Sequence, residues 1–189
     1  MTTVQTGSPA EQPDLSASAV PTSRLLAWLQ AGGLDEKRLE GLHSQDNAFW
    51  AELAAQLAPQ LPPAEILLVL PGGEPLAGAL AAHLKLPFQV LHHASGAPDH
   101  WVLPDAPLPS FGLLVTTYLT TGVPEMELSV LAQRAGCELR TVVCAVERST
   151  AGGRHRLLQL GVNTLAGQRI AETPRGLILE RRRAETRAF

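Results

Sequence analysis

The feature that most constrains this fold is an order of elements that occurs twice along the chain. The first unit consists of the short apolar run EILLVL at 65–70, the turn PGG, the helix-forming segment PLAGALAAHL at 75–84 and a second apolar run, PFQVLHH, at 87–93. The second unit consists of GLLVTT at 112–117, a helix expected over 124–135 and the strand ELRTVVCAVE at 138–147. Strand, turn, helix and strand in that order form a parallel βαβ unit with a right-handed crossover. The sequence therefore predicts an α/β fold with a mostly parallel central sheet flanked by helices.

The segments around these units complete the predicted organisation. Residues 1–21 almost lack large apolar side chains, which predicts a disordered tail, and residues 22–189 suffice for one domain. A first helix capped by Thr22 or Ser23 and a second beginning at Asp46 precede the βαβ units. Further along, we expect a long loop or hairpin at 93–110, a strand near 161–165 and a helix around 175–185.

Charge and cysteine content narrow the function classes. The chain carries 18 acidic and 15 basic residues, so no overall field favours nucleic acid or a membrane as the main partner. The arginines at 181–183 are more typical of a solvated helix face than of a binding patch. Cys137 and Cys144 form no Cys-x-x-Cys pair, which argues against a metal or disulfide framework. Because the sequence has neither a secretory signal nor an apolar run of bilayer length, we expect a cytoplasmic protein.

The loop TTYLTTGVPE at 116–125 is the strongest candidate for a binding site. Ligands of open parallel sheets bind at the carboxyl ends of the strands, and this loop follows one directly. Thr120 and Thr121 offer hydroxyls, Gly122 lets the backbone turn back, and the unpaired amides of a helix beginning at Pro124 favour an anion. The pattern fits a phosphate-binding loop. An ordinary strand-to-helix turn with a threonine cap fits the spacing equally well.

Two other segments give weaker indications of a binding site. Gly72 and Gly73 in LPGGEPLA would allow amides to approach a diphosphate, although a tight turn with positive φ is the favoured interpretation. His92, His93 and His100 raise the question of a metal site. Adjacent residues of a strand point to opposite faces, so we expect no metal there.

At these loops the chain resembles the type I phosphoribosyltransferases. That family has a strand ending in two acidic residues, followed by a Thr-Thr-Gly-Gly-Thr loop that holds the 5′-phosphate of phosphoribosyl pyrophosphate (PRPP). LLVTTYLTTGVP at 113–124 follows this frame, and LPGGEPLAGALAAHLKLPF at 70–88 is similar to the family's pyrophosphate loop and helix. The segments that most resemble orotate phosphoribosyltransferases are LLAWLQAGGL, GLHS, VERSTAGG and LLQLGVNTLAG.

The resemblance implies a fold, a reaction and a set of site residues. The fold is the type I phosphoribosyltransferase fold, with a small hood from the N-terminal segment and the long loop. The reaction transfers ribose phosphate from the magnesium complex of PRPP to a nucleobase, orotate in pyrimidine nucleotide synthesis. The implied sites are Thr120, Thr121, Gly122, Val123 and Pro124 for the 5′-phosphate, Thr116 and Thr117 for the ribose, Pro71, Gly72 and Gly73 for pyrophosphate, Arg148 for the base, and His92 and His93 in the lid. A surface cation at a strand end is an equally good interpretation of Arg148. By analogy with the family we expect a homodimer.

The departures from the family pattern all weaken catalysis. Thr116 and Thr117 replace the paired carboxylates that grip the ribose hydroxyls, and Val123 and Pro124 replace the second glycine and last threonine of the phosphate loop. The lid carries histidines where orotate enzymes have an arginine-lysine pair. Two functions therefore stay open. One is an orotate-like transferase with weak or lost catalysis, using Mg²⁺ through PRPP, and the other is a non-catalytic relative that binds a nucleotide or sugar phosphate or pairs with another protein.

Overall fold

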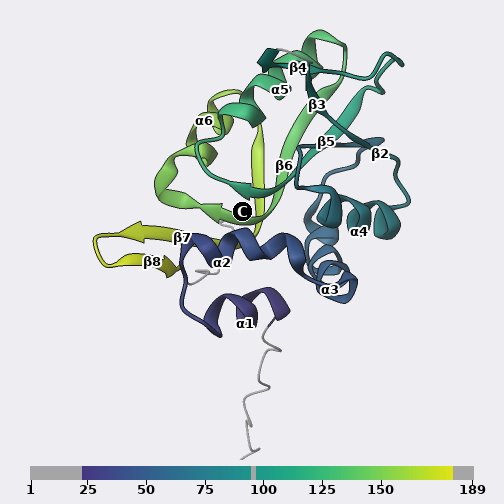
Figure 1. Cartoon of the computed structure of the whole chain (residues 1–189). Coiled ribbons are helices and arrows are strands. Elements are labelled where there is room, and N and C mark those ends of the chain that lie inside the picture. Colours follow the sequence, from purple (N-terminus) through teal and green to yellow (C-terminus); the bar gives the residue numbers. More distant parts are fainter. Residues whose placement is uncertain (1–22, 95–96, 181–189) are drawn as a thin grey trace, which may run out of the picture.

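The centre of the molecule is a six-stranded sheet, shown in Figure 1. The structure is a computed structural model that describes residues 23–94 and 97–180, so the predicted tail at 1–21 and the arginines at 181–183 lie outside the described residues. The strands, in the order in which they pair, are β2 (Phe88–Val90), β1 (Ile66–Val69), β5 (Phe111–Leu119), β6 (Glu138–Arg148), β7 (Asn163–Thr173) and β8 (Gly176–Leu179). All neighbours run parallel except β7 and β8. This confirms the predicted α/β fold with a mostly parallel sheet.

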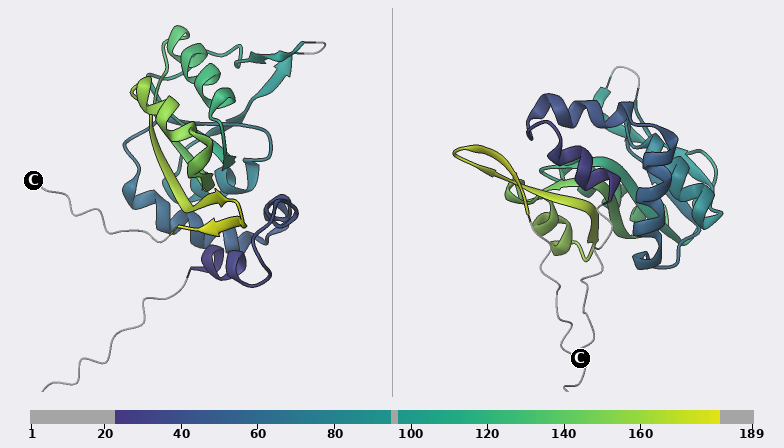
Figure 2. Two further views of the ribbon diagram at one scale, coloured as in Figure 1. Left: turned by 90° about the vertical axis from the view of Figure 1, so that its left-hand side faces the viewer. Right: turned by 90° about the horizontal axis from the view of Figure 1, so that it is seen from below.

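Helices cover both faces of the sheet (Figures 1 and 2). On one face lie α1 (Arg24–Gln30), α2 (Glu36–Glu40), α3 (Asn47–Leu57) and α4 (Glu74–Leu84), and on the other lie α5 (Val123–Arg134) and α6 (Gly153–Gln159). Short 3-10 turns follow α2 at Gly41–Ser44, α3 at Ala58–Gln60 and β6 at Ser149–Ala151. The predicted cap of the first helix is Ser23, whose side chain accepts a hydrogen bond from the amide of Leu26. The second helix was expected to begin at Asp46; it begins at Asn47, and Asp46 is its N-cap, accepting a hydrogen bond from the amide of Phe49. Among the described helices, none combines the length and apolar character needed to cross a bilayer.

Two apolar layers, one on each side of the sheet, hold these elements together. Alternate residues of the central strands point to opposite layers: Leu67 and Val69 of β1 face α3 and α4, whereas Leu68 faces α5. The continuous apolar runs of the sequence are therefore strands buried on both faces. Trp101 joins the second layer from outside the sheet.

The structure corrects three predicted elements. PFQVLHH is not one strand, because β2 ends at Val90 and the histidines begin β3 (His92–Ala94), which pairs with β4 (Ala97–Val102) as a separate antiparallel hairpin. β5 does not end at Thr117 but continues to Leu119, paired with β6. The helix predicted around 175–185 is wrong over its described part, where Gly176–Leu179 forms β8. The long β7 offers an open edge there, and pairing along that edge overrides local helix propensity.

The connections of the sheet reverse direction between β1 and β5. From β1 the chain crosses by α4 to β2 on one side, whereas from β5 it crosses by α5 to β6 on the other. Ligands of open parallel sheets bind at such a switch point, outside the carboxyl ends of the strands. The N-terminal segment reaches these ends through Gly41–Ser44, and the β3–β4 hairpin reaches them through His93 and Trp101.

Candidate functional site

A cavity of about 500 Å³ opens at the carboxyl ends of β1 and β5. It brings together six residues predicted for the site and five that were not. The predicted ones are Pro71, His93, Thr116, Thr120, Val123 and Pro124, and the others are Leu70, Trp101, Tyr118, Glu125 and Glu127. Within the described chain this wall contains two carboxylates and neither lysine nor arginine.

The predicted phosphate loop lies between β5 and α5 and is fitted closely against α6. Gly122 adopts φ +74° as the N-cap of α5, and a Cβ there would come within 2.9 Å of the Cα of Gly153. The amide of Gly153 donates to the carbonyl of Thr120 at 3.0 Å. The alternative of a threonine cap is not what the structure has, because none of the described side chains caps α5. In the described part of the chain the amides of Thr121 and Val123 have no protein acceptor.

Helix α6 holds this loop in place, and the sequence analysis missed the helix. The guanidinium of Arg156 donates to the carbonyls of Thr121, at 2.7 Å, and Ala151, at 3.2 Å. The pair Gly152–Gly153 was the available signal, since Gly152 adopts φ +81° and a Cβ on Gly153 would lie 2.3 Å from the carbonyl oxygen of Thr120. Two helices therefore begin side by side at the loop.

The two threonines at the acidic positions play different parts. Thr116 is 7% exposed and lines the cavity. The Thr117 hydroxyl instead donates to the carbonyl of Gly72 at 2.5 Å, which ties β5 to the loop after β1. A carboxylate at position 117 would face that carbonyl oxygen without a proton to share. The predicted ribose pair is thus divided between one cavity residue and one structural contact.

The predicted pyrophosphate loop is a tight turn. The amide of Gly73 donates to the carbonyl of Leu70 at 2.9 Å, and Gly72 adopts φ +86° beside the ring of His43. A Cβ on Gly73 would approach the carbonyl oxygens of Leu70 and Val115 to 3.0 Å. Of the three residues predicted for pyrophosphate, Pro71 alone lines the cavity. The turn accounts for both glycines without a ligand.

Arg148 is not in the cavity wall. Its guanidinium pairs with the carboxylates of Glu36 and, at 3.5 Å, Glu172, and its Nε donates to the hydroxyl of Tyr118 at 2.7 Å. Its side chain is 16% exposed, so it is not a free surface cation either. Burial raises the pKa of Tyr118, although the hydrogen bond and charge of Arg148 oppose this. Tyr118 therefore separates Arg148 from the cavity.

Glu125 is a candidate functional residue that the sequence analysis did not assign. It stands in the first turn of α5, is 4% exposed and lines the cavity. Burial raises the pKa of its carboxyl to about 7, and a hydrogen bond from its own amide acts in the opposite direction. An acidic residue directly after the phosphate-loop pattern was the signal in the sequence.

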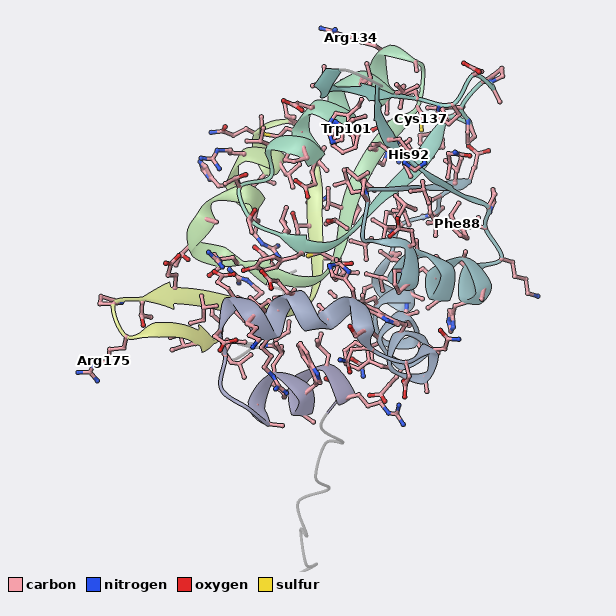
Figure 3. All side chains as sticks on the ribbon, viewed as in Figure 1. Phe88, His92, Trp101, Arg134, Cys137 and Arg175 are labelled. Carbon is pink, nitrogen blue, oxygen red and sulfur yellow. The ribbon has the colours of Figure 1, made fainter. Side chains whose placement is uncertain are left out.

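The β3–β4 hairpin supplies the outer wall. The rings of His93 and Trp101 stack with their centroids 3.8 Å apart, and Trp101 lies between the hairpin and α5 in Figure 3. His92, the other predicted lid residue, is exposed and does not line the cavity. No three potential metal ligands gather anywhere among the residues that the structure describes.

Comparison with known proteins supports the fold alone. No protein-family model matches the sequence, and no curated protein matches it. Among solved structures, orotate phosphoribosyltransferase from Aeropyrum pernix matches with a TM-score of 0.56 at 21% identity, over 71% of this chain and 76% of that one. Adenine phosphoribosyltransferase from Thermoanaerobacter pseudethanolicus matches with a TM-score of 0.55 at 18% identity, over 64% of this chain and 81% of that one. Orotate phosphoribosyltransferase of Mycobacterium tuberculosis H37Rv, solved with inorganic phosphate, matches with a TM-score of 0.52 at 20% identity, over 70% of this chain and 76% of that one. The chain thus has the fold of the type I phosphoribosyltransferases.

Proposed function

Starting from this fold, we propose that the protein is a non-catalytic relative of the phosphoribosyltransferases that binds a nucleotide or sugar phosphate at the loop 120–124. The observation that carries the proposal is the uncapped N-terminus of α5, which opens into the cavity at the switch point of the sheet. Free amides at a helix N-terminus favour an anion, and Thr120 adds a hydroxyl in the same wall.

Loss of catalysis rests on the acidic positions. A hydrogen bond to a charged acceptor contributes about 1.5–3 kcal/mol, so the absence of two carboxylates weakens ribose binding by about 3–6 kcal/mol. That corresponds to a factor of about 10² to 10⁴ in binding or rate. Thr117 is also committed to Gly72. The departing pyrophosphate would meet a wall with two carboxylates and no lysine or arginine among the described residues.

The residues at the predicted ribose positions do not fit magnesium. Mg²⁺ prefers carboxylate oxygens and bound phosphates, whereas Thr116 and Thr117 offer neutral hydroxyls. One of these hydroxyls is bonded to a protein carbonyl.

An orotate-like transferase is the second candidate. It is favoured by the solved orotate enzymes among the structural neighbours and by the position of the cavity between Pro71, Thr116 and Thr120. It would use PRPP with Mg²⁺ and transfer ribose phosphate to orotate. A homodimer belongs to this proposal by analogy with the fold family, and a cytoplasmic location belongs to it as the expectation from the sequence.

Titration with ribose 5-phosphate, followed by the amide resonances of Thr121 and Val123, tests the binding proposal. We expect saturable shifts in the wild type and their loss in Gly122→Ala, whose Cβ would meet the backbone of Gly153. Gly136→Ala is the matched control, because Gly136 has a similar φ of +88° and no atom within 4 Å of its Cβ position. Absence of shifts in the folded wild type would refute phosphate binding.

An activity assay separates the two candidates. With orotate, PRPP and Mg²⁺ at high protein concentration, we expect no orotidine monophosphate. Measurable turnover that disappears in Gly122→Ala but not in Gly136→Ala would replace the binding proposal with the transferase.

A further inference from the structure

The Glu125 carboxyl shares a wall with the phosphate loop but has no role in the function proposed above. It is 4% exposed and lines the cavity beside Thr120 and Pro124. Within the described chain its carboxylate has no ion-pair partner, and its hydrogen-bond partner is its own amide. That amide belongs to the first turn of α5, where an incoming phosphate would lie.

The groups that face Glu125 come from several elements. His93 from β3, Tyr118 from β5 and Glu127 from α5 line the same cavity. From β6, the buried thiol of Cys144 lies close enough for the charge of Glu125 to contribute to its raised pKa, after burial and Glu147. None of these side chains is a permanent cation.

Two arginines of α6 and one of β6 lie near the loop or the cavity wall, and each bonds other groups: Arg148 bonds Tyr118 and pairs with Glu36. Arg154 pairs with the buried carboxylate of Glu147, and Arg156 bonds the carbonyls of Thr121 and Ala151. Among the residues that the structure describes, an anion entering the loop would therefore meet an ionised Glu125 without a lysine or arginine in the wall to compensate its charge. Like charges in a partly dry site repel strongly, whereas a protonated carboxyl donates a hydrogen bond.

We propose that Glu125 makes phosphate binding proton-coupled: the ligand is bound together with one proton from solvent, which resides on the Glu125 carboxyl and is donated as a hydrogen bond to a phosphate oxygen. This inference rests on the proposed function of the loop 120–124. The site then binds anions more tightly at acidic to neutral pH than at alkaline pH.

The sign of the effect follows from burial. Because burial raises the pKa of Glu125 to about 7, the free carboxyl is mainly neutral at pH 6 and mainly ionised at pH 8. An adjacent anion raises that pKa further, since it disfavours a second negative charge. If only the protonated form binds, the apparent dissociation constant rises about tenfold between pH 6 and pH 8.

Sulfate is the probe of choice, because its charge is constant over this range, unlike that of phosphate. Its dissociation constant is measured at pH 6 and pH 8 from the amide shifts of Thr121 and Val123. We expect the tenfold rise in the wild type, and values within about twofold of each other in Glu125→Gln, which keeps a neutral donor. Glu127→Gln and His93→Gln test the other titratable groups of the wall and should keep the tenfold rise.

Each outcome decides between the proposals. A wild-type dissociation constant that does not change with pH overturns proton coupling while leaving anion binding intact. A rise of the dissociation constant that persists in Glu125→Gln, or disappears in His93→Gln, also overturns proton coupling through Glu125. Another titratable group would then cause the pH dependence. If sulfate shifts no loop amide at either pH, anion binding at this loop fails and proton coupling falls with it. The wild-type measurement needs no variant, and thermal melting of Glu125→Gln checks that this variant folds.

Discussion

Replacing Gly153 with alanine tests whether the phosphate loop depends on the close contact with α6. The new Cβ would lie 2.3 Å from the carbonyl oxygen of Thr120 and 3.0 Å from the nitrogen of Gly122, and both are backbone atoms that cannot rotate away. Overpacking costs about 1–3 kcal/mol, and losing the bond from the Gly153 amide to Thr120 costs about 0.5–1.5 kcal/mol. We expect the free energy of unfolding to fall by about 1.5–4.5 kcal/mol.

Urea denaturation measures this loss, and Gly78→Ala is the matched control. Gly78 lies within α4, and its Cβ position has no atom within 4 Å. Alanine there should stabilise the protein by up to about 1 kcal/mol through helix propensity. If Gly153→Ala leaves the unfolding free energy unchanged while Gly78→Ala behaves as expected, the contact between the loop and α6 is not as close as described.

Three further substitutions test other parts of the site. Thr117→Val removes the donor to the Gly72 carbonyl and should cost about 1–3 kcal/mol in urea denaturation, whereas Thr121→Val, at an exposed position, should change little. Arg148→Met should raise the pKa of Tyr118 further, because Arg148 lowers it. The chain has one tyrosine, so phenolate absorbance measures this pKa directly. An unchanged or lower pKa would contradict the contact between Arg148 and Tyr118. Glu125 has its pKa raised from 4.5 to about 7 on folding, so its contribution to stability is complete below about pH 4.5 and is lost as pH rises through 7. Wild-type stability should therefore fall relative to Glu125→Gln by about 3 kcal/mol between pH 4.5 and pH 8, and parallel pH profiles would refute the burial of this carboxyl.

The sequence predicted the βαβ units because apolar runs, glycine turns and caps all indicated the same elements. Ser23 caps the first helix as expected, the second begins within one residue of Asp46, and the loop after β5 opens at the carboxyl end of the sheet. Local patterns failed where pairing at a distance decides the structure. The segment 176–179 is a strand because β7 offers it an edge, not because of its own composition.

The site was predictable in position but not in detail. Topology places Thr116 and Thr120 in one cavity, and that follows from the order of the strands. The bond from Thr117 to Gly72 and the pairing of Arg148 with Glu36 join residues far apart in the sequence, which no local spacing reveals. Glu125 was missed because burial, rather than residue type, makes its carboxyl unusual.

The loops after β5 and β6, which contact each other at Gly122 and Gly153, are also connected to the N-terminal segment. Arg156 donates hydrogen bonds to the carbonyls of Thr121 and Ala151, so one side chain connects the loop after β5 with the loop after β6. The second loop begins at Arg148, which is clasped by Glu36 of the N-terminal segment. Contacts between described residues therefore connect the phosphate loop, through the loop after β6, to the start of α2.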